Sequence, residues 1–353
     1  MASEHTITIN GSECSFKRGE TILQVAERNG IDIPSICYLK GPRPTGACRI
    51  CVVEVKGARN LLPSCATPAA PNMVVETESE RVIQSRKINI ELLLASGEHN
   101  CLTCEANGNC RLQELAYRYQ VERIRFPESP PQYPTETSNA LIIRDFSRCI
   151  LCGRCVQACN EVQVNKAISY GYRGAASKIV AVGDLPYHES ECVFCGECVQ
   201  VCPVGALIEK KSRFQARHWE TEKVQTTCPY CGVGCQIQLH VKDSKIVKVT
   251  GVEGVPPNYG SLCVKGRFGY DFINQHERLT TPLIKENGRL REAPWDEALS
   301  LVARKIGEIK SRYGPDSIGI FSSAKITNEE NYLVQKFARA VIGTNNIDHC
   351  ARL

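Results

Sequence analysis

The sequence of 353 residues has no long hydrophobic run. Its most apolar stretch, Leu92 to Ala95, is far shorter than the ~18 residues that a membrane span needs. The first residues combine neither a basic segment with an apolar one nor a twin-arginine pair, so no secretory signal is predicted. We therefore expect no membrane insertion and a cytoplasmic location, where disulfides do not persist.

The chain also has no large excess of charge of one sign. The chain has 43 Lys and Arg against 38 Asp and Glu, a formal net charge of +5. Because the basic residues are dispersed along the chain, nucleic acid is not an expected partner. What the sequence has is cysteine, 21 in all. An odd number of cysteines in a reducing compartment argues against a disulfide framework and favours metal binding.

Eight cysteines form a motif that occurs twice, 43 residues apart. The copies read Cys149-x2-Cys152-x2-Cys155-x3-Cys159 and Cys192-x2-Cys195-x2-Cys198-x3-Cys202-Pro203. Three closely spaced thiolates can bind one cubane while the fourth cysteine reaches the other cluster. We therefore assign one 4Fe-4S cluster to Cys149, Cys152, Cys155 and Cys202, and a second to Cys192, Cys195, Cys198 and Cys159. Structural zinc, the alternative, would favour separated Cys-x2-Cys pairs.

A third 4Fe-4S site is predicted by Cys228-Pro-Tyr-Cys231-Gly-Val-Gly-Cys235, with Cys263 as the fourth ligand. The glycines let the backbone fold tightly around inorganic sulfide. This run resembles the amino-terminal iron-sulfur segment of molybdenum or tungsten bis-pterin oxidoreductases, most of all cytoplasmic formate dehydrogenases. The resemblance implies that Lys265 lies between cluster and pterin, contacts the cofactor and assists electron transfer. On the sequence alone, Lys265 could equally be a solvated surface lysine.

Cys37-x10-Cys48-x2-Cys51-x13-Cys65 suits a 2Fe-2S cluster. It follows an alternating segment, residues 6–16, which predicts a hairpin around Asn10-Gly11, and a predicted helix over residues 21–28. Together these features resemble the β-grasp domain at the front of the large iron-sulfur subunit of respiratory complex I and of related hydrogenases and formate dehydrogenases.

The run of His99, Cys101, Cys104 and Cys110 resembles the histidine-plus-three-cysteine 4Fe-4S site of the same proteins. The complex I pattern has its histidine where this chain has Gly97, whereas His99 matches soluble NAD-linked hydrogenases and formate dehydrogenases. An exposed capping histidine is the alternative. As a ligand, a neutral imidazole makes the cluster less negative and raises its potential.

Two cysteines remain. Cys14 lies in the alternating segment and is expected to be a small core residue. Cys350 belongs to residues 345–353, which resemble the formate dehydrogenase segment that leads into the metal-ligating selenocysteine or cysteine. We therefore expect that ligand immediately after Leu353 and no catalytic residue within the sequence.

The expected fold class is α+β with several domains. In order, we expect a β-grasp 2Fe-2S domain (1–78), a small helical 4Fe-4S domain with one histidine and three cysteine ligands (79–120), a proline-rich linker (121–140), a ferredoxin-type domain with two 4Fe-4S clusters (141–217), a 4Fe-4S domain of molybdopterin oxidoreductases (218–280) and the start of a molybdopterin-binding α/β domain (281–353). The linker contains residues 127–134, too rich in proline for a helix or central strand.

Periodicity predicts further elements. Helices are expected over residues 81–95, 112–119, 296–313 and 328–342, a hairpin over 241–250 and a buried strand over 317–322. The helix 296–313 has Leu299, Val302, Ile306 and Ile309 on one apolar stripe.

The four ordered cluster motifs resemble the amino-terminal part of the catalytic subunit of an NAD(P)- or ferredoxin-linked formate dehydrogenase. The resemblance implies an electron relay between partner subunits and a bis-molybdopterin guanine dinucleotide centre with molybdenum or tungsten, acting on formate and carbon dioxide. The expected partners are flavin- and NAD(P)-binding subunits, small iron-sulfur subunits, ferredoxin or a hydrogenase. The 353 residues alone are expected to lack formate turnover. A non-catalytic electron-transfer subunit of a complex I-like or hydrogenase assembly is the alternative.

Overall fold

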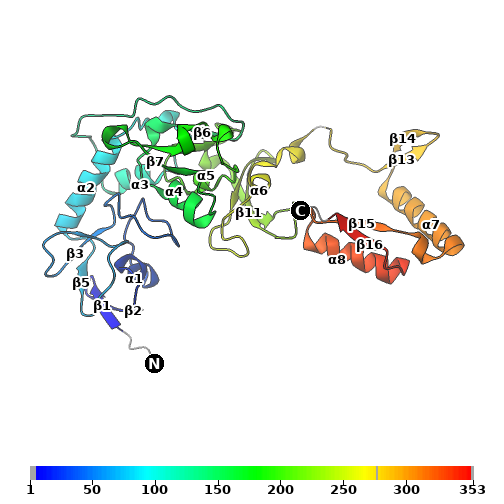
Figure 1. Cartoon of the computed structure of the whole chain (residues 1–353), viewed down its shortest axis with the longest axis horizontal. Helices are drawn as coiled ribbons and strands as arrows, with labels where there is room; N and C mark the ends of the chain where they lie inside the picture. The colour runs from blue at the N-terminus through cyan, green and yellow to red at the C-terminus, as the bar shows by residue number, and fades with distance from the viewer. Residues whose placement is uncertain (1–4, 276, 351–353) are drawn as a thin grey trace. The chain divides into compact units, whose positions relative to one another are not determined.

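The computed structural model describes residues 5–275 and 277–350 (Figure 1). The chain forms two compact units, Met1–Thr221 and Glu222–Leu353. Across the described residues, no helix is both long and apolar enough to cross a membrane.

The first unit begins with a five-stranded sheet in the order β2-β1-β5-β3-β4. Its strands are β1 (His5–Ile9), β2 (Ser12–Phe16), β3 (Val52–Val55), β4 (Leu62–Pro63) and β5 (Val74–Glu76). Asn10 and Gly11 both have positive φ, 49° and 80°, the backbone that a two-residue hairpin turn requires. The predicted hairpin is therefore confirmed, and Cys14 is a core residue, 2% exposed.

One helix covers this sheet. α1 (Ile22–Arg28) begins at a capping box made by Thr21 and Gln24, which satisfies backbone N–H groups at the start of the helix. Its apolar residues enter the core that contains β1, β2 and β3. This arrangement confirms the expected helix, and the same core contains Cys51 and Cys65.

Two longer helices follow. They are α2 (Glu80–Ala95) and α3 (Arg111–Arg118), with the 3₁₀ turn η1 (Cys101–Thr103) between them. Both helices lie close to their predicted bounds. Residues 127–134 form neither helix nor strand, as their prolines predict.

The cysteine repeat is also a structural repeat. Each copy has a non-glycine residue at positive φ followed two residues later by a left-handed glycine, namely Leu151 with Gly153 and Phe194 with Gly196. Each glycine is the N-cap of a short helix, α4 (Arg154–Gln157) or α5 (Glu197–Val201), and these helices contact each other. Cys155 in α4 thus corresponds to Cys198 in α5.

Small paired strands and single turns surround these helices. The pairs are β6 (Ile142–Arg144) with β9 (Leu207–Glu209) and β7 (Ile168–Gly171) with β8 (Lys178–Ala181), both antiparallel. The turns are η2 (Phe146–Arg148), η3 (Ala158–Val162, of π type), η4 (Gly174–Ala176), η5 (Val182–Asp184), η6 (Tyr187–Glu189) and η7 (His218–Glu220).

The second unit contains an antiparallel sheet and an α/β segment. The sheet consists of β10 (Glu222–Thr227), β11 (Gln236–Lys242) and β12 (Lys245–Gly251), and it is followed by α6 (Val264–Phe268) and η8 (Asp271–Asn274). The α/β segment has β13 (Leu283–Glu286), β14 (Arg289–Glu292), α7 (Trp295–Tyr313), η9 (Pro315–Ser317), β15 (Ile320–Ser323), α8 (Asn328–Lys336), the π turn η10 (Phe337–Ile342) and β16 (Ile347–Cys350). The predicted hairpin and both helices are confirmed.

The predicted burial of the strand near residue 320 is wrong. β15 is parallel to β16, but Phe321 on β15 is 93% exposed. On α7, the stripe residues Leu299, Val302 and Ile309 are exposed as well. In the described part of the chain this sheet has two strands, and α8 contacts β15 (Figure 1). A local apolar pattern predicts a strand, whereas its burial depends on the layers that surround it.

Candidate iron-sulfur sites

The thiols of Cys37, Cys48, Cys51 and Cys65 come together beside the five-stranded sheet, and all four residues are buried. The Cys48 backbone N–H donates to the Cys37 Sγ at 3.5 Å. Hydrogen bonds from Cys48 and Cys65 lower the pKa of Cys37 to about 2, and a hydrogen bond from Cys65 lowers the pKa of Cys51 to about 7. The four sulfur atoms therefore form one group of interacting donors.

A buried arginine on α2 fixes the loop around Cys51. Arg86, 0% exposed, donates from Nε to the Ile50 carbonyl and from Nη2 to the Val52 carbonyl, both at 3.0 Å. Its Nη1 donates to Tyr119 Oη at 2.8 Å. Because Ile50 and Val52 flank Cys51, this arginine determines where the third thiol of the group lies.

His99, Cys101, Cys104 and Cys110 line one pocket. The His99 Nε2 atom lies 3.1 Å from the Leu93 carbonyl oxygen at the end of α2. Burial lowers the pKa of His99 and raises the pKa values of Cys101 and Cys110. The cap of η1 is Asn100, whose side-chain oxygen accepts from the Leu102 N–H. His99 is thus a pocket residue with a neutral imidazole.

Two glycines keep space free at this pocket. A Cβ atom at Gly97 would lie 2.4 Å from the Ser147 carbonyl oxygen and 2.8 Å from His99 Nε2, so no side chain fits where the complex I pattern has its histidine. A Cβ atom at Gly205 would lie 2.5 Å from Cys104 Sγ. At both positions a larger residue would occupy space that the neighbouring atoms of the pocket already need.

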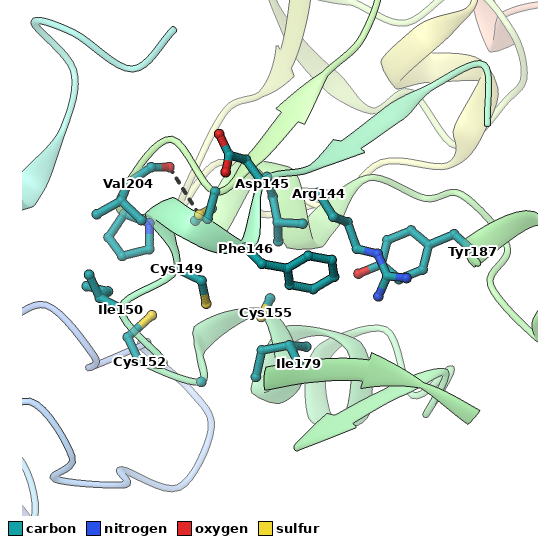
Figure 2. A pocket seen from close by; sticks show the side chains of 15 residues that line it. Arg144, Asp145, Phe146, Cys149, Ile150, Cys152, Cys155, Ile179, Tyr187 and Val204 are labelled. Atoms are coloured by element: carbon teal, nitrogen blue, oxygen red, sulfur yellow. Dashed lines mark hydrogen bonds between the residues drawn. The ribbon is translucent and has the colours of Figure 1, made fainter. Parts of the chain in front are cut away.

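Cys149, Cys152, Cys155 and Cys202 line a second pocket (Figure 2). Burial raises the pKa of Cys149 to about 11 and that of Cys152 to about 12. Cys202 comes from the second copy of the motif, and its Sγ donates to the Val204 carbonyl at 3.1 Å. The fold therefore brings the last cysteine of one copy to the first three cysteines of the other.

Three of the remaining thiols of the repeat, those of Cys159, Cys192 and Cys195, interact with one another. The pKa of Cys192 is raised first by burial and then by the charges of Cys195 and Cys159. Burial raises the pKa of Cys155, and the charge of Cys198 adds to this rise. The two groups of thiols therefore lie next to each other.

In the second unit, Cys228, Cys231, Cys235 and Cys263 interact. Burial raises the pKa of Cys235 most, followed by the charges of the other three. The Cys228 N–H donates to the Cys235 carbonyl at 2.8 Å, which closes the loop. Lys265 lies in the first turn of α6, after Cys263, and its side chain is exposed. Cys350 is an exposed residue of β16, whereas Leu353 lies outside the described residues.

These donor sets fit iron-sulfur clusters. Each consists of four thiols, or of three thiols and one imidazole, which is the ligand chemistry of such clusters. Among residues 5–275 and 277–350, no group of three or more His, Cys, Asp or Glu is placed to hold a single metal ion.

Sequence reasoning missed Arg86, Gly205 and Tyr187, which contact or line these sites. Gly205 follows Cys202-Pro203-Val204 and could have been noticed beside the motif. Arg86 lies in a predicted helix as an ordinary polar residue, and Tyr187 lies outside every motif, so neither had a local signal.

Comparison with known families gives five matches in chain order. They are a 2Fe-2S iron-sulfur cluster binding domain (residues 2–80), an NADH-ubiquinone oxidoreductase-G iron-sulfur binding region (86–125), a 4Fe-4S dicluster domain (148–206), a molybdopterin oxidoreductase Fe4S4 domain (221–275) and a molybdopterin oxidoreductase domain (278–353). The predicted fold class is confirmed.

Curated relatives agree with this architecture. "Putative formate dehydrogenase YrhE" of Bacillus subtilis is 37% identical over 389 residues, covering 98% of this chain and 40% of the relative. The NADPH-Fe(3+) oxidoreductase subunit alpha of Geobacter sulfurreducens is 37% identical over 348 residues, covering 99% of this chain and 40% of the relative. The chain thus spans about 40% of the length of these relatives.

Among solved structures, an NAD+-reducing [NiFe]-hydrogenase matches with a TM-score of 0.53 and 35% identity, covering 61% of this chain and 91% of that chain. Taken with the ordered domains and the relatives, the chain belongs to the molybdopterin oxidoreductases and corresponds to the iron-sulfur-rich, amino-terminal part of their formate dehydrogenase-like members.

Proposed function

We propose that the chain is the electron relay of a formate dehydrogenase or carbon dioxide reductase catalytic subunit. The observation that carries this proposal is the grouping of donors: residues that are far apart in sequence, such as Cys149 and Cys202, line one pocket. A set of separate cluster sites along one chain suits the transfer of electrons over a distance that a single step would cross too slowly.

The proposed ligands are the sets assigned from the sequence. One 2Fe-2S cluster is held by Cys37, Cys48, Cys51 and Cys65. Four 4Fe-4S clusters are held by His99, Cys101, Cys104 and Cys110; by Cys149, Cys152, Cys155 and Cys202; by Cys192, Cys195, Cys198 and Cys159; and by Cys228, Cys231, Cys235 and Cys263. Support comes from the interactions within each group and from the fit of the donors.

Neighbouring sites in the first unit share side chains, which supports transfer between them. Val204 lines both the pocket of His99 and the pocket of Cys149. One hydrophobic cluster contains Cys37 and Cys48 and packs against Cys110, Cys149 and Cys202. The proposed clusters therefore lie in a shared apolar environment, in which ligand identity and nearby hydrogen bonds set each potential.

At the other end of the relay, the proposed contact to the pterin is Lys265. A bis-pterin molybdenum or tungsten centre, when bound, supplies the chemistry that removes two electrons from formate. Lys265 follows the last cysteine of its group by two residues. Burial raises the pKa of Cys228, and the charge of Lys265 opposes this rise. A cation there favours the thiolate form of that ligand.

We further propose that a metal-ligating selenocysteine or cysteine follows Leu353, because residues 345–353 resemble the segment that leads to it. Mass spectrometry of the native subunit tests this proposal: a peptide that continues past Leu353 with neither residue would contradict it. The proposed partners are flavin- and NAD(P)-binding subunits, small iron-sulfur subunits, ferredoxin or a hydrogenase.

The test of function uses the native subunit and the 353-residue chain, both purified without oxygen. Formate should reduce the clusters of the native subunit, and electron paramagnetic resonance (EPR) detects this reduction. The 353-residue chain should accept electrons from dithionite but give no formate-dependent dye reduction. Formate turnover by the 353-residue chain would contradict the proposed division of labour.

A second candidate is a non-catalytic electron-transfer subunit, because a solved structure that matches this chain is that of an NAD+-reducing [NiFe]-hydrogenase. The same experiment separates the two. A native subunit whose clusters are reduced by NADPH or NADH but never by formate supports this second candidate.

A further inference from the structure

Tyr187, at the start of η6, is a buried phenol without a hydrogen-bond partner for its hydroxyl. Its side chain is 0% exposed, and no protein atom lies within hydrogen-bond distance and angle of the hydroxyl oxygen. Buried hydroxyl groups in native proteins are nearly always hydrogen-bonded, since leaving one unpaired costs free energy. The hydroxyl therefore points to a partner outside the protein chain.

The place of this hydroxyl indicates the partner. Tyr187 lines the pocket of Cys149, Cys152, Cys155 and Cys202. In Figure 2 its side chain enters from one side, and the hydroxyl is at the end that faces Phe146 and Cys155. Burial raises the pKa of Tyr187 well above its ordinary value, and the charges of Cys198, Cys155 and Cys192 add to this rise, so the phenol keeps its proton and can donate a hydrogen bond where the two groups of thiols adjoin.

A charged neighbour strengthens the phenol as a donor. The guanidinium carbon of Arg144 lies 4.1 Å from the centre of the Tyr187 ring, and Arg144 is 4% exposed. Glu136 accepts from the Arg144 Nε at 2.5 Å and, through Oε1, from the Tyr187 backbone N–H at 3.2 Å. These contacts hold the Tyr187 ring against a cation. The charge of Arg144 opposes the rise in the pKa of the phenol, which makes its O–H group a better donor.

Resting on the cluster assignment of the proposed function, we propose that Tyr187 sets a cluster potential. Its hydroxyl donates a hydrogen bond to a sulfur atom of the 4Fe-4S cluster held by Cys149, Cys152, Cys155 and Cys202. A hydrogen bond to sulfur stabilises the reduced, more negative cluster more than the oxidised one. Tyr187 therefore raises the potential of this cluster relative to its twin in the repeat.

The experiment is an EPR-monitored redox titration of the reconstituted chain with Tyr187→Phe. At a fixed potential, the ratio of reduced to oxidised cluster should fall about tenfold, which is ~59 mV for a one-electron couple. The affected signal should be the one that Cys202→Ala removes. An unchanged titration, or a shift confined to the cluster of Cys192, overturns the proposal.

The matched control is Tyr170→Phe. Tyr170 also lies near Cys152 and Cys155, but its hydroxyl already donates to the Leu151 carbonyl at 3.2 Å. This variant should leave the titration unchanged, and an equal shift in both variants would overturn the proposal. Resonance Raman gives a second readout: the iron-sulfur bands should shift in D₂O in the parent chain and lose part of that shift in Tyr187→Phe.

If Tyr187→Phe does not retain the cluster, the same redox titration with 3-fluorotyrosine at position 187 tests the proposal. It keeps the hydroxyl and makes it a stronger donor, so the potential should rise, whereas a fall or no change contradicts the proposal. Absence of clusters from the parent chain would refute the proposed function itself, and so the two failures are distinguishable.

Discussion

His99 and Leu93 are joined by a contact of 3.1 Å between the imidazole Nε2 and the backbone carbonyl oxygen at the end of α2. A carbonyl oxygen only accepts, so Nε2 carries the proton and Nδ1 carries the lone pair. The contact fixes the ring and leaves Nδ1 as the atom that can ligate iron.

His99→Cys should therefore keep a cluster in this pocket but lower its potential, because a thiolate adds negative charge. His99→Ala should lose that cluster. Redox titration with EPR detection measures both effects, and His188→Ala, at an exposed histidine, is the control. Equal potentials for His99→Cys and the parent chain would show that His99 is no ligand.

Gly205→Ala should selectively empty the same pocket. The added Cβ would lie 2.5 Å from Cys104 Sγ, a distance that forces the sulfur to move. The matched control is Gly266→Ala, whose Cβ would lie 3.5 Å from Cys228 Sγ, an ordinary contact. Iron content and EPR of the two variants measure the effect, and equal cluster loss in both would refute the steric explanation.

Arg86→Met should destabilise the chain by about 3 kcal/mol, the scale for breaking a buried charged network. The carbonyl groups of Ile50 and Val52 would lose their donors, so we also expect weaker retention of the 2Fe-2S cluster. Arg81→Met is the control, because Arg81 and Glu54 form an exposed pair at 3.6 Å worth roughly 0.5 kcal/mol. Urea unfolding measures both variants, and similar losses would contradict the account.

The stability of the chain should depend on the ion pair of Glu91 and Arg125 in a defined pH range. Arg125 donates two hydrogen bonds, at 2.7 and 2.8 Å, to the buried Glu91 carboxylate and lowers its pKa below the ordinary value of 4.5. The unfolded state then binds more protons near that pH, so the stabilisation is present above pH 4.5 and is lost as the pH falls through the lowered pKa.

Thermal unfolding of Arg125→Met across this range measures the effect. The difference from the parent chain should be largest above pH 4.5 and shrink in acid. A difference that does not change with pH would mean that Arg125 contributes through packing alone.

The cysteine groups could be predicted from the sequence because their information is local. Ligands two or three residues apart, and the doubled motif with its displaced last cysteine, identify a cluster site without knowledge of the fold. The pairing of Cys202 with Cys149 follows from the same pattern, and the two residues line one pocket.

The surroundings of the sites could not be predicted in this way. Arg86 contacts Ile50, which is 36 residues away, and Tyr187 lies against Arg144. Such contacts exist only after distant segments have packed. The exposure of Phe321 has the same origin, because an apolar pattern predicts a strand but not what lies over it.

The most direct test of the account is to count iron and acid-labile sulfide in the anaerobically reconstituted chain and to record its Mössbauer spectrum. One 2Fe-2S and four 4Fe-4S clusters predict about 18 iron atoms per chain, in both cluster types. Bound zinc in place of iron, or a spectrum without 4Fe-4S clusters, would contradict the proposal that the chain is an iron-sulfur electron relay.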